Sequence, residues 1–391
     1  MRENYGGFGA ERQGAIYRAG ATGQPPRLPI SPEQLEAEAT KGLPAETADY
    51  VAGGAGAGST VGANRAEFDR WHLLPRMLRD VHARDLTREL FGVVLPAPVL
   101  LAPIGGLATV RTDGELAVAR AAASLGVPFV ASTLTSASLE EIAAASGTGR
   151  RWFQLYWGPD RDLNLSLVQR AEAAGYSAIV VTVDTRLLAW RERDLTRGYL
   201  PFLTGAGLGN YLSDPIFRAR LERPPGEDPV AAARLAIAQI GDPTFVWSDV
   251  QFLADRVRVP IVVKGILHPE DASAAMEAGA NGLIVSNHGG RQVDGSVPAL
   301  RALPAVVAEV GGRVPVLFDS GIRRGSDALK ALALGAQAVL LGRLYAWGLA
   351  LDGESGVREA VENFLADLDL TLAEIGCARL SDLGRQSIAP A

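Results

Sequence analysis

One histidine in this sequence occupies a position suited to proton transfer. His288 follows a short apolar run at 282–287 and precedes Gly289 and Gly290, so it lies in a turn that can expose its ring. Imidazole gains and loses a proton near neutral pH, which makes His288 a candidate general base. The other histidines precede the apolar runs or open a helix: His72, His82 and His268.

Charged side chains follow the same apolar run and one other. Asp184 ends the run at 178–184, where its carboxylate could orient the imidazole or could instead cap a turn or helix. Arg191 and Arg291 lie just beyond these two runs. One such arginine would usually form a surface ion pair, but two guanidinium groups beside a base predict a pocket that binds a small carboxylate.

A second anion site is predicted further along the chain. The segments Asp-Ser-Gly-Ile-Arg-Arg-Gly at 319–325 and Gly-Arg at 342–343 each follow an apolar run and combine backbone amides with guanidinium groups. Loops of this kind after the last two strands of a barrel commonly bind phosphate. Lys264 ends another run, where it could stabilise negative charge on a bound ring or form a structural ion pair. A phosphorylated cofactor or substrate is therefore expected.

Eight short apolar runs carry these residues at their ends. Most runs are continuous rather than alternating, as expected for strands covered on both faces, and helix-like stretches separate them. Strands that alternate with helices predict a parallel sheet. The runs are 98–103, 128–133, 151–156, 178–184, 261–265, 282–287, 315–320 and 338–342.

A repeated glycine favours one closed barrel. Gly126, Gly175, Gly279 and Gly335 each end a helix-like stretch shortly before the next run, where a left-handed residue can terminate a helix. Eight units, four of which end their helix with this glycine, predict a (β/α)8 TIM barrel that forms a single domain over 1–391. No G-x-G-x-x-G pattern follows the first run, which disfavours an open doubly wound sheet, and two smaller α/β domains are the alternative.

Segments outside the repeat are expected to cover the barrel. Residues 1–30 are rich in Gly, Pro, Arg and Gln and predict an extended arm. A helix should begin at Ser31, and a second short helix should cover 45–51, so that the chain has an N-terminal helical segment. The spacing of the runs breaks once, after the fourth, and the proline-containing segment 194–247 predicts a lid over the pocket.

Composition limits the classes of function. The 391 residues are 48% hydrophobic with a formal net charge of -6, and no basic block suggests nucleic acid or an anionic membrane as a partner. A single cysteine, Cys377, excludes an internal disulfide and a Cys/His zinc site, and no metal site is predicted. No signal-peptide core or bilayer-spanning run is present, so a soluble cytoplasmic protein is expected.

Five segments of the chain match a known family in sequence and in order. They are Phe-Gln-Leu-Tyr at 153–156, Val-Lys-Gly at 263–265, Ser-Asn-His-Gly-Gly-Arg at 286–291, Asp-Ser-Gly-Ile-Arg at 319–323 and Lys-Ala-Leu-Ala-Leu-Gly at 330–335. With them the chain resembles the FMN-dependent L-2-hydroxy acid oxidases and dehydrogenases, from Leu43 through Leu383. The resemblance implies an FMN cofactor, a small 2-hydroxy acid and O2 as substrates, and a homo-oligomer of four or eight subunits.

The resemblance also implies a role for each residue at the strand ends. His288, supported by Asp184, would take the hydroxyl proton of the substrate while a hydride passes to the flavin. The substrate would be held by Tyr50, Tyr156, Arg191 and Arg291. The flavin would be bound by Ile104, Gly105, Ser132, Gln154, Thr182, Lys264 and Ser286, and its ribityl chain and phosphate by Asp319, Gly321, Arg323, Gly342 and Arg343.

Within the family, the chain is most similar to lactate 2-monooxygenases. The similarity includes Ala-Pro-Ile-Gly at 102–105, Arg-Asp-Leu-Thr at 193–196 and Tyr-Ala-Trp-Gly at 345–348. Gly105 replaces an alanine typical of the oxidases, whereas Leu134 stands at a pocket position that is bulkier in glycolate oxidase. The expected reaction is oxidation of L-lactate or a similar acid with decarboxylation to acetate, carbon dioxide and water. The alternative is an oxidase that releases the 2-oxo acid and H2O2.

Overall fold

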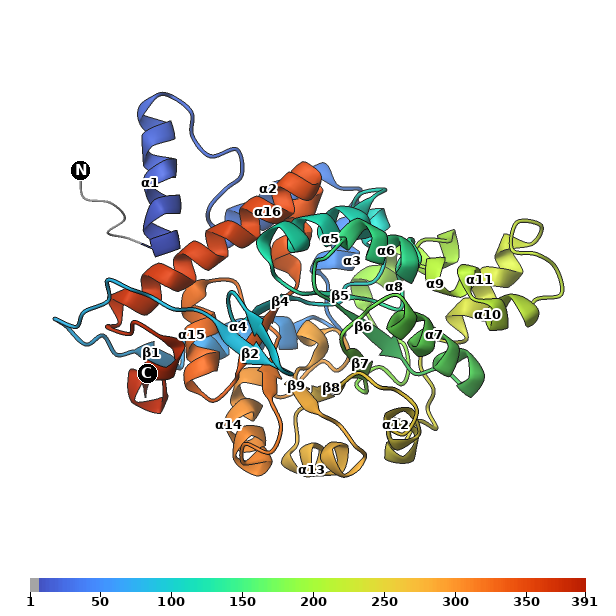
Figure 1. Cartoon of the computed structure of the whole chain (residues 1–391). Coiled ribbons are helices and arrows are strands. Elements are labelled where there is room, and N and C mark those ends of the chain that lie inside the picture. The colour runs from blue at the N-terminus through green and yellow to red at the C-terminus, as the bar shows by residue number, and fades with distance from the viewer. Residues whose placement is uncertain (1–6) are drawn as a thin grey trace.

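A closed barrel of eight parallel strands forms the centre of the computed structural model, which describes residues 7–391 (Figure 1). Neighbouring strands follow chain order, and the last pairs with the first to close the barrel. The strands coincide with the eight apolar runs, so the predicted (β/α)8 barrel is confirmed. They are β4 Val99–Leu101, β5 Phe129–Ala131, β6 Arg151–Tyr156, β7 Ile179–Thr182, β8 Ile261–Ile266, β9 Gly282–Val285, β10 Val316–Phe318 and β11 Ala338–Leu341.

Helices cover the outside of the barrel and return the chain to its amino-terminal end. The predicted terminating glycines have positive φ, for example +66° at Gly126 and +108° at Gly335, so each lets a helix end directly before a strand. The covering helices are α5 Gly114–Leu125, α6 Leu139–Ser146, α7 Arg161–Ala173, α12 Trp247–Ala254, α13 Pro269–Glu277, α14 Ala299–Val310, α15 Gly325–Ala333 and α16 Arg343–Glu374.

The interior of the barrel is filled and its amino-terminal end is closed. Alternate strand residues such as Leu100, Val180 and Leu317 point inward and form a buried cluster of their own. The antiparallel hairpin β2 (Arg88–Leu90) and β3 (Val93–Leu95) packs onto this cluster from below through Leu90 and Leu95. Because this end is plugged, a ligand site can open only at the carboxyl ends of the strands.

The amino-terminal segment corrects one expectation. Instead of an extended arm over 1–30, residues 7–21 form helix α1 (Gly7–Ala21), while residues 1–6 lie outside the described part of the chain. α1 packs on α16: the Gly9 amide donates to Asp369 Oδ2 at 2.8 Å, and Arg12 pairs with Glu359 and Glu362. Helix formation here depends on a partner over three hundred residues away in sequence, so local composition does not reveal it.

The next helices agree with the sequence. Ser31 caps α2 (Pro32–Gly42), with its hydroxyl accepting from the Gln34 amide, and α3 (Ala45–Ala52) ends at Gly53. α4 (Ser59–Phe68) follows, and then strand β1 (Trp71–Leu73), which pairs with β12 (Ile388–Pro390) at the other end of the chain. α3 therefore brings Tyr50 to the rim of the barrel.

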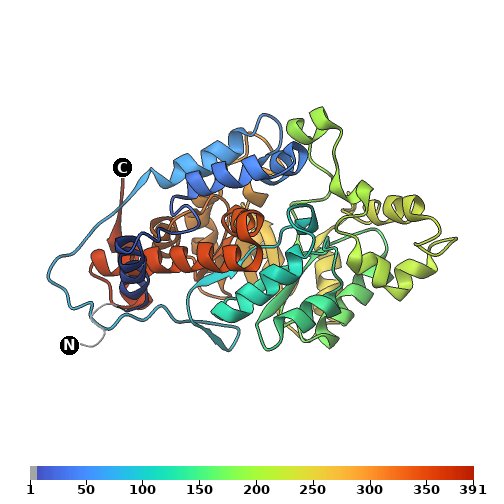
Figure 2. The same ribbon diagram turned by 90° about the horizontal axis from the view of Figure 1, so that it is seen from above.

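The insertion between β7 and β8 extends sideways from the barrel (Figures 1 and 2). It contains α8 (Glu192–Arg197), which packs on α3, and then α9 (Gly209–Ser213), α10 (Pro215–Ala219) and α11 (Pro229–Ile237). Within the predicted lid segment 194–247, only Phe202 and Ile240 line the central cavity. Among residues 7–391, no helix is long and apolar enough to cross a membrane.

Candidate active site

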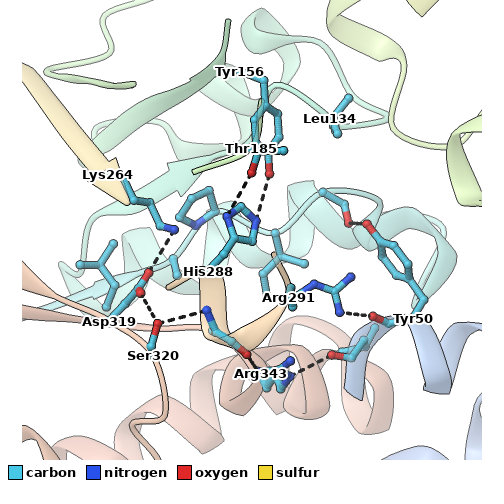
Figure 3. Close-up of a pocket in the computed structure, with 18 of the residues that line it drawn as sticks. Tyr50, Leu134, Tyr156, Thr185, Lys264, His288, Arg291, Asp319, Ser320 and Arg343 are labelled. Carbon is cyan, nitrogen blue, oxygen red and sulfur yellow. Dashed lines mark hydrogen bonds and ion pairs between the residues drawn. The ribbon is translucent and has the colours of Figure 1, made fainter. Parts of the chain in front are cut away.

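A cavity opens at the carboxyl ends of the barrel strands, with about 1020 Å³ of empty space including its mouth (Figure 3). Residues from distant parts of the chain meet there, because parallel strands end at the same face of a barrel. The predicted site residues that line the cavity are Tyr50, Ile104, Gly105, Tyr156, Arg191, Lys264, His288, Arg291, Asp319, Arg323, Gly342 and Arg343.

His288 is held by hydrogen bonds at both ring nitrogens. Its Nδ1 lies 2.8 Å from Asp184 Oδ1. Its Nε2 lies 3.3 Å from the hydroxyl of Tyr156, a contact drawn in Figure 3. The residue has φ +59°, a left-handed conformation that is unusual for a side chain of this size. The flanking Gly289 and Gly290 also have positive φ, so the whole turn is shaped to present the imidazole to the cavity.

The electrostatics of the pair favour a neutral imidazole beside an ionised carboxylate. Burial lowers the pKa of His288 below its usual 6.5 and outweighs the opposite effect of Asp184. Burial alone would raise the pKa of Asp184, but its neighbours His288 and Lys264 hold that pKa below its ordinary value. A neutral ring whose Nδ1 proton is fixed by a carboxylate can accept a proton at Nε2.

Two arginines and a tyrosine form the wall opposite His288. Arg291 donates to the carbonyls of Tyr50 and Gly53, and its guanidinium lies 4.9 Å from the centre of the Tyr50 ring. Arg191 donates to the Arg291 carbonyl at 3.2 Å and to Gln292 Oε1 at 3.1 Å. Both arginines therefore end at the cavity with guanidinium edges that can bind a carboxylate.

A third arginine, Arg343, makes this side of the cavity strongly cationic, since it donates to the same Gly53 carbonyl as Arg291. Arg343 donates only to carbonyls, those of Val51, Gly53 and Gly289, and no acidic group of the described residues lies within 4.0 Å of Arg343 or Arg291. Burial and repulsion from Arg291 and Arg323 lower the pKa of Arg343 to about 9. Burial and repulsion from Arg191 lower the pKa of Arg291 to about 10. A group of desolvated cations without counter-ions is the electrostatic signature of an anion site.

Lys264 stands at the end of β8 among polar partners. Its Nζ lies 3.0 Å from Ser286 Oγ and 3.4 Å from Asp319 Oδ2, and its side chain is buried. Burial opposes its charge, but the carboxylates of Asp319 and Asp184 outweigh that effect and raise its pKa. The sequence left two roles open for Lys264, a structural ion pair or a charge facing the pocket. In the structure Lys264 pairs with Asp319 and also faces the cavity as a permanent cation.

Five predicted cofactor residues do not line the cavity. Four of them form a buried hydrogen-bonded layer beneath it: Ser132 Oγ donates to Gln154 Oε1, Gln154 Nε2 donates to Thr182 Oγ1, and Lys264 donates to Ser286. The fifth, Gly321, has φ +95° and lies against Asn64, so that a side chain there would touch Asn64 O at 3.0 Å. In this structure these residues support the cavity floor and walls.

Sequence reasoning missed several residues that complete the site. Thr185 lies 3.1 Å from Asp184 Oδ1 and 3.4 Å from His288 Nδ1, and Ser320 Oγ accepts from the amides of Asn287 and Gly289. Each adjoins a predicted residue, so the strand-end rule could have found them. Leu188, Phe202 and Ile240 line the cavity from loops that no periodic pattern locates.

Comparison with known proteins gives consistent results. A family model for FMN-dependent dehydrogenases matches residues 39–390. An L-lactate oxidase of Lysinibacillus sphaericus is 42% identical to this chain over 362 residues, which cover 93% of each protein. An FMN-dependent alpha-hydroxy acid dehydrogenase of Penicillium citrinum is 42% identical over 386 residues, which cover 98% of this chain and 95% of that protein. The crystal structure of a mandelate oxidase superimposes with a TM-score of 0.82 at 40% identity, covering 93% of this chain and 98% of that one.

Proposed function

Because the chain belongs to the family of FMN-dependent 2-hydroxy acid oxidases and dehydrogenases, we propose that it oxidises L-lactate or a similar small L-2-hydroxy acid and decarboxylates the product. For lactate the balanced reaction converts lactate and O2 into acetate, carbon dioxide and water. The oxidation step of this proposal is supported by the His288–Asp184 pair, which lies with two cavity arginines at the carboxyl face of the barrel.

The donor set of the cavity fits FMN. Arg323 and Arg343 supply positive charge for a phosphate, and the open space beside Gly342 leaves room for it. Lys264 would supply a fixed cation that stabilises negative charge on a bound flavin ring. When bound, FMN supplies the acceptor for the two electrons of the substrate and passes them to oxygen.

Different side chains of the cavity bind the substrate, take its hydroxyl proton and stabilise the charge that forms. Arg291 and Arg191 bind the substrate carboxylate and so orient the hydroxyl-bearing carbon. His288 Nε2 takes the hydroxyl proton, while Asp184 holds the Nδ1 proton and stabilises the imidazolium that forms. The Tyr156 hydroxyl, 3.3 Å from Nε2, donates a hydrogen bond to the substrate oxygen or the carboxylate.

The decarboxylation half depends on retention of the 2-oxo acid. If pyruvate stays in the cavity, hydrogen peroxide formed from O2 adds to its carbonyl carbon, the O–O bond is reduced as the C1–C2 bond breaks, and acetate, carbon dioxide and water result. The glycine at 105 and the insertion residues over the cavity support retention. Measurement of acetate against pyruvate plus peroxide from L-lactate under air tests the proposal, and a protein that forms only pyruvate and peroxide contradicts it.

A plain oxidase is the second candidate function. Several curated relatives carry the name L-lactate oxidase, and two of them are 42% and 46% identical to this chain. On that alternative, the 2-oxo acid leaves before peroxide forms, and the same measurement gives equal amounts of pyruvate and peroxide.

A further inference from the structure

The insertion is joined to the end of strand β5 by one buried asparagine. Asn210, at the start of α9, is fully buried, and its Nδ2 lies 3.3 Å from Ser132 O, 3.0 Å from Thr133 O and 2.9 Å from Thr135 Oγ1. Because three hydrogen-bond acceptors surround one end of the Asn210 amide, that end must carry the NH2 group. Asn210 Oδ1 has no hydrogen-bond partner among the described residues, so the contact uses the amide as a donor.

Backbone contacts continue the attachment on both sides of Asn210. The Gly209 amide donates to Thr135 O at 2.7 Å, and the Gly207 amide donates to Ser136 Oγ at 2.8 Å. A side chain at 209 would lie 2.3 Å from Ser136 O, so this part of the insertion lies flat on the loop after β5. Residues 207–210 are therefore a fixed attachment rather than part of a moving lid.

The attachment joins two segments that both contribute residues to the cavity. On the barrel side, Leu134 lies within the loop that Asn210 holds, and it lines the cavity beside Gly105. On the insertion side, Phe202 is 3% exposed, lines the cavity and packs edge-on against Tyr50 at 6.4 Å between ring centres. Gly205, between Phe202 and the attachment, has φ +88°, and Gly207, the first residue of the attachment, has φ +78°.

We propose that Asn210 is a positioning residue that holds Phe202 over the occupied cavity and so slows the escape of the 2-oxo acid product. The segment from Phe202 to Asn210 is short and turns at glycines, so the place of the phenyl ring is set by where the segment is anchored. Loss of the three hydrogen bonds from Asn210 weakens the anchor, which the Gly207 and Gly209 amides still hold in part, while no residue assigned to the reacting atoms is substituted. The inference deepens the proposed function, since a retained product is what decarboxylation requires.

The test measures product escape directly in the FMN-loaded protein. Pyruvate binding to the oxidised protein is followed by the change in flavin absorbance, and its dissociation rate is measured by stopped flow for wild type, Asn210→Ser, Phe202→Ala and the double variant. Asn210→Ser should speed dissociation by about tenfold, the factor expected for loss of one or two net hydrogen bonds. If Asn210 acts through Phe202, the double variant should release pyruvate no faster than Phe202→Ala alone.

Two further variants separate positioning from general destabilisation. Ser166 Oγ donates to buried Asp214 Oδ2 at 2.8 Å and anchors the insertion to α7 away from the cavity. Ser166→Ala removes an anchor of similar kind and should leave pyruvate dissociation unchanged. If Asn210→Ser does not fold, Thr135→Val removes one acceptor of the Asn210 amide with little change in shape, and it should speed dissociation to a smaller extent.

The outcomes are distinct. The inference is overturned by unchanged dissociation in the Asn210 and Thr135 variants, by additive effects of Asn210→Ser and Phe202→Ala, or by an equal effect of Ser166→Ala. Anaerobic flavin reduction by lactate should stay within about twofold of wild type, since Asn210 touches none of the reacting groups. A wild type that forms only pyruvate and peroxide contradicts the proposed function alone, because the dissociation measurement does not depend on the oxygen product.

Discussion

The side chain of Leu134 closes the space beside Gly105. A Cβ at position 105 would lie 2.9 Å from Leu134 Cβ, closer than carbon atoms normally approach, and 3.5 Å from Leu134 Cδ1, an ordinary contact distance. The φ of Gly105 lies outside the left-handed region, so the backbone itself does not require glycine there. Glycine at 105 is therefore needed for space, and the residue that occupies that space is Leu134.

The first prediction concerns this pair. In Gly105→Ala the new methyl must push Leu134 and the loop that Asn210 holds, so pyruvate should escape faster and the product should shift from acetate toward pyruvate and peroxide. Products are quantified under air after FMN content has been checked. In Gly105→Ala/Leu134→Gly the Cβ at position 134 that causes the collision is absent, and the acetate yield should recover in part. An unchanged yield in the single variant contradicts the role assigned to Gly105.

The second prediction concerns the base. His288→Gln should keep FMN but slow flavin reduction by lactate by a factor on the order of 10² or more, the usual effect of losing a general base. Stopped-flow reduction without oxygen isolates this step. His268→Gln is the matched control, because His268 only caps α13 by accepting from the Glu270 amide. Near-normal reduction in His288→Gln would remove His288 from the mechanism.

The third prediction concerns pH. The base acts in its neutral form, so kcat/KM should rise with pH through the pKa of His288 and level off above it. Because burial lowers that pKa, the midpoint should lie below 6.5. Asp184 raises the pKa of His288, so Asp184→Asn should move the midpoint to still lower pH while reducing the plateau rate. A midpoint that moves upward in Asp184→Asn is inconsistent with this arrangement.

The fourth prediction separates substrate binding from cofactor binding. Arg291→Lys should raise KM for lactate strongly and change FMN affinity little, because lysine lacks the planar fork that binds a carboxylate. Arg343→Lys should have the opposite pattern, since Arg343 lies at the cationic end near Arg323. FMN affinity is measured by quenching of flavin fluorescence on reconstitution. Equal losses of both properties in Arg291→Lys would indicate that its bonds to Tyr50 and Gly53 make it a structural residue.

The fifth prediction concerns the cofactor and stability. Denaturation should release FMN and not FAD, as chromatography will show. Removal of FMN leaves Arg323 and Arg343, whose charges repel each other, without the phosphate, so the apoprotein should melt at lower temperature than the FMN-loaded protein. Inorganic phosphate should restore part of the difference. A melting temperature that does not respond to FMN or phosphate argues against a phosphate site at Arg343.

The barrel and most of the cavity could be predicted from the sequence for one physical reason. Strands covered on both faces appear as continuous apolar runs, and parallel strands place their next residues, such as His288 and Asp184, at one face. Contacts made by irregular segments leave no periodic signal. The helix at 7–21 depends on α16, and the attachment at Asn210 depends on the loop after β5, so neither could be found before the chain was folded.

The pairing of β4 with β11 has a consequence for biosynthesis. The first barrel strand to leave the ribosome has to wait for the last, because Val99 pairs with Val339. The loops after these two strands contribute Gly105 and Gly342 to the same cavity, so a nascent chain has no complete flavin pocket until α16 has begun to emerge. FMN should therefore be acquired only near the end of translation or after it, and a chain stalled earlier exposes an open sheet edge to aggregation and chaperones.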